Sequence, residues 1–276
     1  ICTVLIARPA HVDRDAERSS SRDIVLCLDV SGSALPYDRA VIETYLELVS
    51  HFRGERIALS IFNSTSRTVF PLTDDYDLVS SQLTKAADAL RGVESQDDID
   101  KMSDKDYQKI ADWLEGTQNR KNSTSLIGDG LVSCAAMIPG FAYGDTSGAA
   151  RQRPASIVLA TDNVASGTPT YSLAQALDMA EASHISVDGL FSGPRQSEGD
   201  ATTTEMKQQI ESRGGTFLTQ SGSSDINELV RQIDSRRTSE SRRSSQAALI
   251  DAPGWWTLML VVLLAIWMIL AWRLRR

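Results

Sequence analysis

The sequence is poor in the residues that build the commonest catalytic and metal sites. Cysteine and histidine each occur only three times in 276 residues. The spacing of Cys2, Cys27 and Cys134 gives neither a disulfide framework nor a zinc motif. Because Cys27 lies in an apolar run and Cys134 on the apolar face of a predicted helix, we expect both to pack as small hydrophobic side chains.

The motifs of common enzyme classes are lacking as well. The histidines are too scattered to accompany a carboxylate at catalytic spacing. There is no Gly-rich phosphate loop of the GxxxxGK(S/T) type and no nucleophile elbow. We therefore expect that the protein is not an enzyme. Among enzymes, a metal-dependent hydrolase is the alternative.

Positive charge is scarce, and the formal net charge is −8. Nucleic-acid recognition needs a clustered basic surface, so we expect no nucleic-acid partner. The densest basic run consists of Arg236, Arg237, Arg242 and Arg243, in a Ser-rich stretch over residues 236–254. We interpret this stretch as a solvated linker that touches lipid headgroups.

One long apolar run lies near the C-terminal end. Residues 255–272 carry no charge, with Trp255 and Trp256 at one end and Trp272 at the other. At about 1.5 Å per helical residue, these eighteen residues span roughly 27 Å, close to the hydrocarbon thickness of a bilayer. Tryptophan favours membrane interfaces. The run therefore predicts a C-terminal transmembrane helix with a basic tail at residues 273–276, and the lipid bilayer as a partner.

Residues 1–8 resemble the tail of another apolar, transmembrane segment, with a cleaved signal peptide as the alternative, and residues 9–22 are a polar connector. Between connector and linker, residues 23–235 alternate β-rich and amphipathic segments. We expect strands at 24–28, 56–62, 67–70, 155–160, 185–191 and 216–219, and helices at 41–52, 74–90, 127–138, 172–182, 205–212 and 225–233. This order predicts an α/β fold: a doubly wound, mostly parallel, Rossmann-like sheet with helices on both faces.

Residues 93–122 interrupt the alternation and are interpreted as an insertion. An acidic loop is followed by Ser103 and Asp106, spaced as a capping box for a short helix that carries Tyr107 and Trp113. The insertion directly precedes the polar segment at Thr124. It either shapes the choice of partner or is a surface helix that packs its aromatic side chains inward.

Oxygen ligands follow two of the predicted central strands. Asp29, Ser31 and Ser33 come after the first buried strand, and Asp162 follows the strand at 155–160. In parallel sheets the binding site lies at the carboxyl ends of the strands, where strand order reverses. Carboxylates and neutral hydroxyls suit a hard cation, and the hydroxyls leave the ion enough charge to attract an outside carboxylate.

Three sequence pieces together resemble the von Willebrand factor A (vWA) domain: Asp29-x-Ser31-x-Ser33, Ser125-Leu126-Ile127-Gly128 and Thr161-Asp162. In that family the pieces form the metal-ion-dependent adhesion site (MIDAS). The resemblance implies that Asp29, Ser31, Ser33, Ser125 and Asp162 bind a divalent cation, most simply Mg²⁺, with Mn²⁺ or Ca²⁺ as alternatives.

This sequence departs from the family pattern at two positions. Ser125 stands where family members usually have Thr, so the adjacent Thr124 is an alternative ligand. Asn163 replaces a Gly that many bacterial members carry. Asp129 could belong to the outer shell of the site.

The resemblance implies binding and not turnover: a partner's Asp or Glu would complete the coordination of the metal. The layout of an apolar segment, a vWA domain and a C-terminal anchor is similar to the bacterial Bat-type (aerotolerance) membrane proteins. These are commonly associated with MoxR-type AAA+ ATPases, and other membrane vWA proteins are further partners. The layout implies a domain on the extracytoplasmic side of a bacterial cell membrane. The alternative is a metal-independent scaffold of the same fold with a vestigial site.

Overall fold

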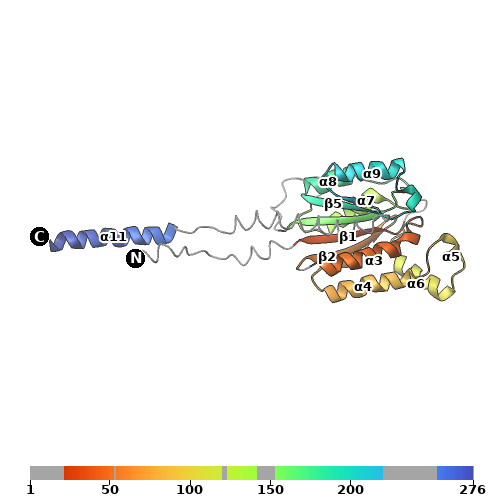
Figure 1. Cartoon of the computed structure of the whole chain (residues 1–276), viewed down its shortest axis with the longest axis horizontal. Coiled ribbons are helices and arrows are strands. Elements are labelled where there is room, and N and C mark those ends of the chain that lie inside the picture. Colours follow the sequence, from red (N-terminus) through yellow and green to blue (C-terminus); the bar gives the residue numbers. More distant parts are fainter. Residues whose placement is uncertain (1–21, 53, 120–122, 142–152, 220–253, 276) are drawn as a thin grey trace. The chain divides into compact units, whose positions relative to one another are not determined.

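The computed structural model describes residues 22–52, 54–119, 123–141, 153–219 and 254–275 (Figure 1). The chain forms two compact units. One is Ser21–Arg237, which contains the α/β domain, and the other combines Ile1–Ser20 with Thr238–Arg276. Each unit is described by itself below.

The α/β domain is built on a six-stranded sheet with the order β3-β2-β1-β4-β5-β6. Its strands are β1 (Asp23–Asp29), β2 (Arg56–Phe62), β3 (Ser66–Thr73), β4 (Ala155–Thr161), β5 (Ile185–Phe191) and β6 (Phe217–Leu218). Only the β2–β3 pair is antiparallel within this sheet. The prediction of a doubly wound, mostly parallel sheet is confirmed.

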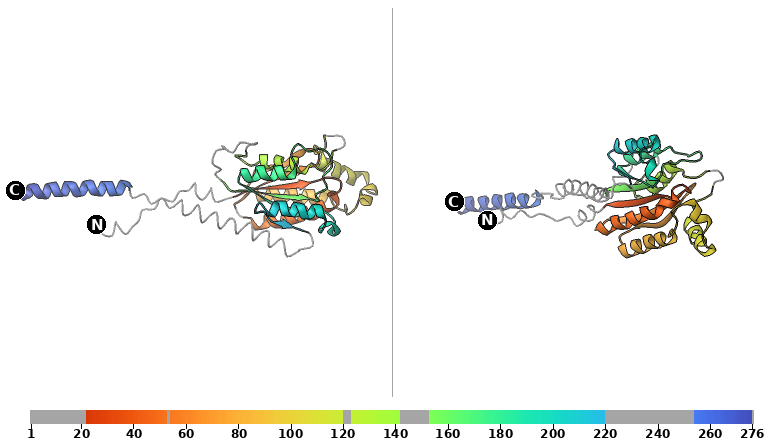
Figure 2. Two further views of the ribbon diagram at one scale, coloured as in Figure 1. Left: turned by 90° about the horizontal axis from the view of Figure 1, so that it is seen from above. Right: turned by 45° about the vertical axis from the view of Figure 1, so that its right-hand side comes forward.

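Helices cover both faces of the sheet (Figures 1 and 2). They are α3 (Leu35–His51), α4 (Tyr76–Ala89), α5 (Gln96–Asp100), α6 (Asp104–Leu114), α7 (Ile127–Ala136), α8 (Leu173–Ala182), the short 3₁₀ helix η1 (Arg195–Ser197) and α9 (Ala201–Glu211). Alternate residues of β1 face opposite cores. Leu26 packs in the core shared with α3 and α4, whereas Val25 packs in the core shared with α7, α8 and α9. Both faces of β1 are therefore buried, which explains its continuous apolar sequence.

The region around α9 differs from the prediction. The sequence predicts no helix between the strand at 185–191 and the helix at 205–212, but η1 lies within this segment and α9 begins at Ala201. Three Thr residues at 202–204 disfavour a helix by propensity. Tertiary packing prevails, because Thr203, Met206 and Ile210 form one buried face of α9. The helix predicted at 225–233 lies outside the described residues.

The segment interpreted as an insertion contains α5 and α6. The Ser103 side chain accepts a hydrogen bond from the Asp106 backbone N–H, so the predicted start of α6 is confirmed. The guanidinium of Arg67 lies 5.7 Å from the centroid of the Trp113 ring and donates to the Trp113 carbonyl at 2.6 Å. Tyr107 is 55% exposed. One aromatic side chain thus packs against the domain and the other faces solvent, which leaves both interpretations of the insertion open.

The second unit contains the helix α11 (Gly254–Leu274), at the position predicted for the anchor. Its apolar side chains at 259, 262–264, 266–270, 272 and 274 are exposed, and the side chains of the remaining residues at 255–258, 260 and 261 are not described. Within the described part of the chain, no helix is long and apolar enough to cross a bilayer.

Candidate metal site

The two predicted aspartates lie on adjacent strands. β1 pairs with β2 on one side and with β4 on the other, so successive connections leave β1 in opposite directions. Asp29 is the last residue of β1, and Asp162 directly follows Thr161, the last residue of β4. Asp29 and Asp162 therefore both lie at the point where the strand order reverses, which is where open α/β sheets bind their ligands.

Asp29 is fully buried at this edge and accepts hydrogen bonds from its own loop, from the end of β4 and from the segment before α7. Its Oδ2 accepts from the Ser125 hydroxyl at 2.6 Å and from the Thr161 hydroxyl at 2.7 Å. Its Oδ1 accepts from the Ser31 backbone N–H at 3.0 Å. The Asp29 carboxylate thus ties together three segments that are distant in the sequence.

Ser125 is held in an unusual backbone conformation. Its φ is 59°, in the left-handed region that β-branched residues avoid. The Ser125 N–H donates to the Asn63 side chain at 3.3 Å, and the Leu126 N–H donates to the Asn63 carbonyl at 2.9 Å. Ser125 is buried, whereas Thr124 is exposed and pairs through its backbone with Ser166. The positive φ explains why this chain carries Ser and not Thr at the loop position that faces Asp29.

Asp162 carries an oxygen that no described residue bonds. The residue is 5% exposed; its Oδ1 accepts from the Val164 N–H at 2.9 Å, and its Oδ2 has no hydrogen-bond partner in the described part of the chain. The Ser33 hydroxyl lowers the pKa of the Asp162 carboxyl, and it lies 3.4 Å from the Ser31 hydroxyl. Asn163 has φ 58°, a conformation that Gly and Asn adopt more readily than other residues, which accounts for the departure from Gly.

Burial dominates the electrostatics of both carboxylates. It raises the pKa of Asp29 to about 6, against the lowering effect of the hydrogen bonds from Ser125 and Thr161. It also raises the pKa of Asp162, opposed by the hydrogen bond from Ser33. A divalent cation would offset the cost of keeping two neighbouring carboxylates ionised away from water.

The donor set fits a hard cation. Asp29, Ser31, Ser33, Ser125 and Asp162 carry carboxylate and hydroxyl oxygens at this edge of the sheet. The buried Oδ2 of Asp162 has no hydrogen-bond partner among the described residues and would be available to a cation. No group of three or more His, Cys, Asp or Glu residues that could hold a metal occurs in the described ranges. Any ion at this edge would therefore depend on the serine hydroxyls as well as on the two carboxylates.

Two residues that are not among the predicted ligands support the site. Thr161 donates to Asp29, and Asn63 positions the backbone of Ser125. The β1–β4 register, which pairs Leu28 with Ala160, places Thr161 beside Asp29, but this register is not readable from the sequence. Asn63 lies between the strands expected at 56–62 and 67–70, a position for which the sequence indicates no role in the site.

Asp129 fixes a neighbouring loop. Its two carboxylate oxygens accept from the backbone N–H groups of Thr170 and Tyr171 at 3.0 and 2.8 Å. A Cβ on Gly128 would stand 2.0 Å from the Tyr171 carbonyl oxygen, so this close approach of α7 to the loop before α8 requires glycine. These contacts account for Asp129 structurally, and its outer-shell role stays a prediction.

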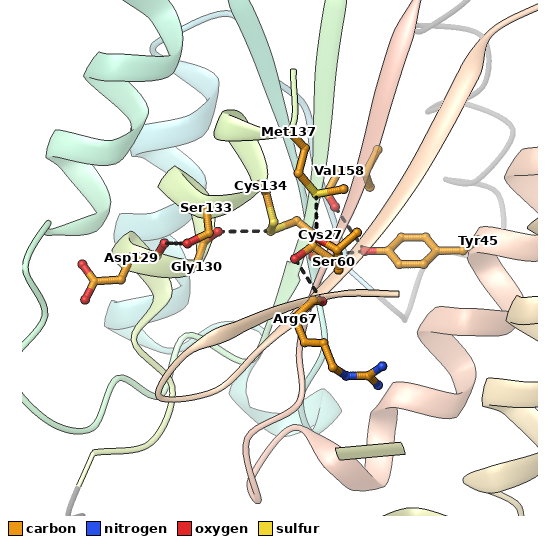
Figure 3. Close-up of a disulfide and its surroundings, with 11 residues drawn as sticks. Cys27, Tyr45, Ser60, Arg67, Asp129, Gly130, Ser133, Cys134, Met137 and Val158 are labelled. Carbon is orange, nitrogen blue, oxygen red and sulfur yellow. Dashed lines mark hydrogen bonds between the residues drawn. A yellow bond between two sulfur atoms is a disulfide. The ribbon is translucent and has the colours of Figure 1, made fainter. Parts of the chain in front are cut away.

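Cys27 of β1 and Cys134 of α7 form a disulfide bond, with their Cα atoms 6.1 Å apart (Figure 3). Both residues are buried, as predicted, but the expectation of two separate thiols is wrong. Their separation of 107 residues offers no local spacing signal, and only the packing of α7 on β1 brings them together. On the opposite face of the sheet, the Tyr45 hydroxyl donates to the Val158 carbonyl at 3.1 Å (Figure 3). Cys2 lies outside the described residues.

The sheet order and the three loops at its edge define a vWA-like domain. No protein-family model and no curated protein matches the sequence.

Among solved structures, the conserved hypothetical protein BatB of Bacteroides thetaiotaomicron is similar, with 16% identity over 81% of this chain and 99% of its own, and a TM-score of 0.49. An aerotolerance-related membrane protein of Bacteroides fragilis shares 17% identity over 77% of this chain and 99% of its own, with a TM-score of 0.45. The manganese-loaded TRAP protein of Plasmodium vivax shares 14% identity over 78% of this chain and 72% of its own, with a TM-score of 0.44. Similarities of this size concern the fold and leave the ligand open.

Proposed function

We propose that this protein is a membrane-anchored vWA module that binds a protein partner through a divalent cation, most simply Mg²⁺. The partner supplies an Asp or Glu carboxylate, and the module belongs to a bacterial envelope assembly. On the layout of the sequence, that assembly includes other membrane vWA proteins and a MoxR-type ATPase. The proposal includes no catalytic role.

The hydrogen bond from Ser125 to Asp29 supports this proposal most strongly. Ser125 is the position at which the sequence departs from the family, yet its hydroxyl lies 2.6 Å from the Asp29 carboxylate. Asp162 presents a buried oxygen without a described partner from the adjacent strand. Among the described residues, protein groups leave at least one oxygen at this edge without a hydrogen-bond donor. A site that binds an ion needs such an oxygen.

The residues of the site would have two roles, holding the cation and orienting its ligands. Asp29, Ser31, Ser33, Ser125 and Asp162 would hold the cation, which when bound attracts the carboxylate of a partner. Thr161 and the Ser31 N–H orient the Asp29 carboxylate, and Asn63 holds Ser125 at its positive φ. Because the supporting groups lie at strand ends or within two residues of them, the ligands would be pre-positioned before the partner arrives.

The disulfide supports placement of the domain outside the cytoplasm. Disulfides persist in oxidising compartments and are uncommon in the reducing cytosol. The Cys27–Cys134 bond is buried beneath the site, between β1 and α7. Membrane attachment itself rests on the uncharged sequence 255–272 and on the exposed apolar side chains of α11.

One observation favours a second candidate function, a scaffold with a vestigial site. Both oxygens of Asp29 are already bonded by protein groups, so these loops are tied together without an ion. Such a domain would bind its partner through its surface, and binding would not depend on metal.

Metal-dependent capture distinguishes the two functions. The full chain, purified in detergent with an affinity tag, is incubated with solubilised membranes of the source cell in Mg²⁺ or in EDTA. We expect a partner that is retained in Mg²⁺, released by EDTA and lost with Asp29→Ala. Asp77→Asn, which changes an exposed carboxylate on α4, is the control and should retain the partner. A partner that stays bound in EDTA and to Asp29→Ala would support the scaffold and exclude the metal bridge.

A further inference from the structure

A third carboxylate lies buried at the same edge of the sheet. Asp38 is in the first turn of α3, the helix that follows the Asp29–Ser33 loop, and it is 0% exposed. Its neighbours on the buried face of α3 include Leu35, Val41 and Ile42. An apolar residue would suit this face of the helix better, because burying a carboxylate is unfavourable unless the charge is paired and hydrogen-bonded.

The contacts of Asp38 connect it to the candidate metal site. The Ser192 hydroxyl donates to the Asp38 Oδ1 at 3.5 Å, and the Ser192 N–H donates to the Thr161 carbonyl at 3.0 Å. The adjacent Gly193 lies against Asp162, since a Cβ on this glycine would stand 3.1 Å from the Asp162 Cβ. Asp38, in the first turn of α3, is therefore connected through Ser192 to the strand ends that carry Asp29 and Asp162.

The other oxygen of Asp38 is unsatisfied. Its Oδ2 is buried and has no hydrogen-bond partner in the described part of the chain, and no ion pair to Asp38 is found there. The charges of Asp29 and Asp162 both act on Asp38 and, after burial, raise its pKa well above the ordinary value. Three buried carboxylates that repel one another need a cation or protons to balance them.

Direct ligation by Asp38 does not fit the geometry. No group of three carboxylates among the described residues is close enough to hold one metal ion. A hydrogen bond to a ligand of the ion does fit, because Oδ2 is an acceptor without a described donor. Mg²⁺ usually keeps several of its water ligands, and buried acceptors around a metal orient such ligands.

We propose that Asp38 is a positioning residue of the cation site, which accepts a hydrogen bond at Oδ2 from a water ligand of the ion and thereby raises cation affinity. This role rests on the proposed function of the site. This role accounts for the burial of Asp38, which lies outside the Asp-x-Ser-x-Ser motif and which the fold does not require.

Titration calorimetry of the full chain in detergent with Mn²⁺ and with Mg²⁺ tests the role. Outer-shell partners of metals are typically worth about 10- to 100-fold in affinity, so we expect Asp38→Asn to weaken binding by about that factor. Asp188→Asn is the matched control, because Asp188 is equally buried but lies within β5 and accepts from the Thr216 N–H at 2.8 Å. It should leave the cation affinity within about twofold of wild type.

Thermal melting in EDTA separates positioning from a structural role. Asp38→Asn removes a carboxylate from a group of three, so the metal-free protein should melt at the same or a higher temperature while its cation affinity falls. If Asp38→Asn does not fold, Ser192→Ala is the second variant; it removes the Asp38 donor without changing charge and should weaken cation binding by roughly 2- to 10-fold.

Two results would overturn the inference and leave the proposed function standing. One is cation affinity in Asp38→Asn and Ser192→Ala equal to wild type while Asp29→Ala abolishes binding. The other is an equal loss of affinity in Asp38→Asn and in the Asp188→Asn control. No cation binding by the wild-type chain would instead contradict the proposed function itself.

Discussion

Replacing Ser125 by alanine isolates the hydrogen bond on which the site depends. The substitution removes the hydroxyl that donates to Asp29 at 2.6 Å and leaves the backbone conformation equally strained. At pH 8 the Asp29 carboxyl is ionised in the metal-free protein, because its pKa is about 6. A hydrogen bond to a charged group contributes about 1.5–3 kcal/mol, so Ser125→Ala should lower the free energy of unfolding by about that amount.

Urea unfolding of the full chain in detergent, at pH 8 and in EDTA, measures this loss. For a domain of this size the same change should lower the melting temperature by roughly 3–12 °C. The remaining donors to Asp29 are Thr161 and the Ser31 N–H, and neither replaces the lost hydroxyl from its own position. A change below about 0.5 kcal/mol, the range of ordinary surface substitutions, would refute the reasoning that this bond is formed and buried.

Three further predictions follow from the same structure. Ser125→Thr, the residue usual in the family, should be destabilising by about 1–3 kcal/mol in urea unfolding, because φ is 59° there; a neutral effect would mean that the loop adopts another conformation. Reducing the Cys27–Cys134 bond, or replacing both residues by alanine, should lower the free energy of unfolding by about 2–5 kcal/mol, and alkylation of the oxidised, denatured protein should label neither cysteine. For Asp29, the folded pKa of about 6 exceeds the ordinary 3.8, so the folded state binds more protons between these values. The free energy of unfolding of the metal-free protein relative to Asp29→Asn should therefore fall by about 2–3 kcal/mol as pH rises from about 4 to 7, and a rise over that range would show that Asp29 is not desolvated.

The fold was predictable where burial and sequence period agree. The bounds expected for two strands, 56–62 and 185–191, match β2 and β5, because apolar runs bounded by turns leave little choice of structure. The start of α9 was not predictable, since its threonines favour other conformations and only packing of Thr203, Met206 and Ile210 decides the matter.

Part of the candidate site could likewise be predicted from the sequence, and part could not. Asp29 and Asp162 could be placed because each follows a buried strand, and position at a strand end is a local property. Thr161, Asn63 and Asp38 could not be assigned, because their contacts depend on strand register and on the approach of distant segments. The Cys27–Cys134 bond was missed for the same reason: its partners share no local pattern.

The central claim is that the edge formed by Asp29, Ser125 and Asp162 binds a divalent cation. Thermal melting of the full chain in detergent, with Mg²⁺ or with EDTA, tests it most directly, with Asp29→Ala measured in parallel. A ligand that binds only the folded state adds about 2.7 kcal/mol at 100 times its dissociation constant, which corresponds to a rise of roughly 5–11 °C in melting temperature. We predict this rise for wild type and none for Asp29→Ala. Equal melting temperatures of wild type in saturating Mg²⁺, Mn²⁺ and EDTA would contradict the claim.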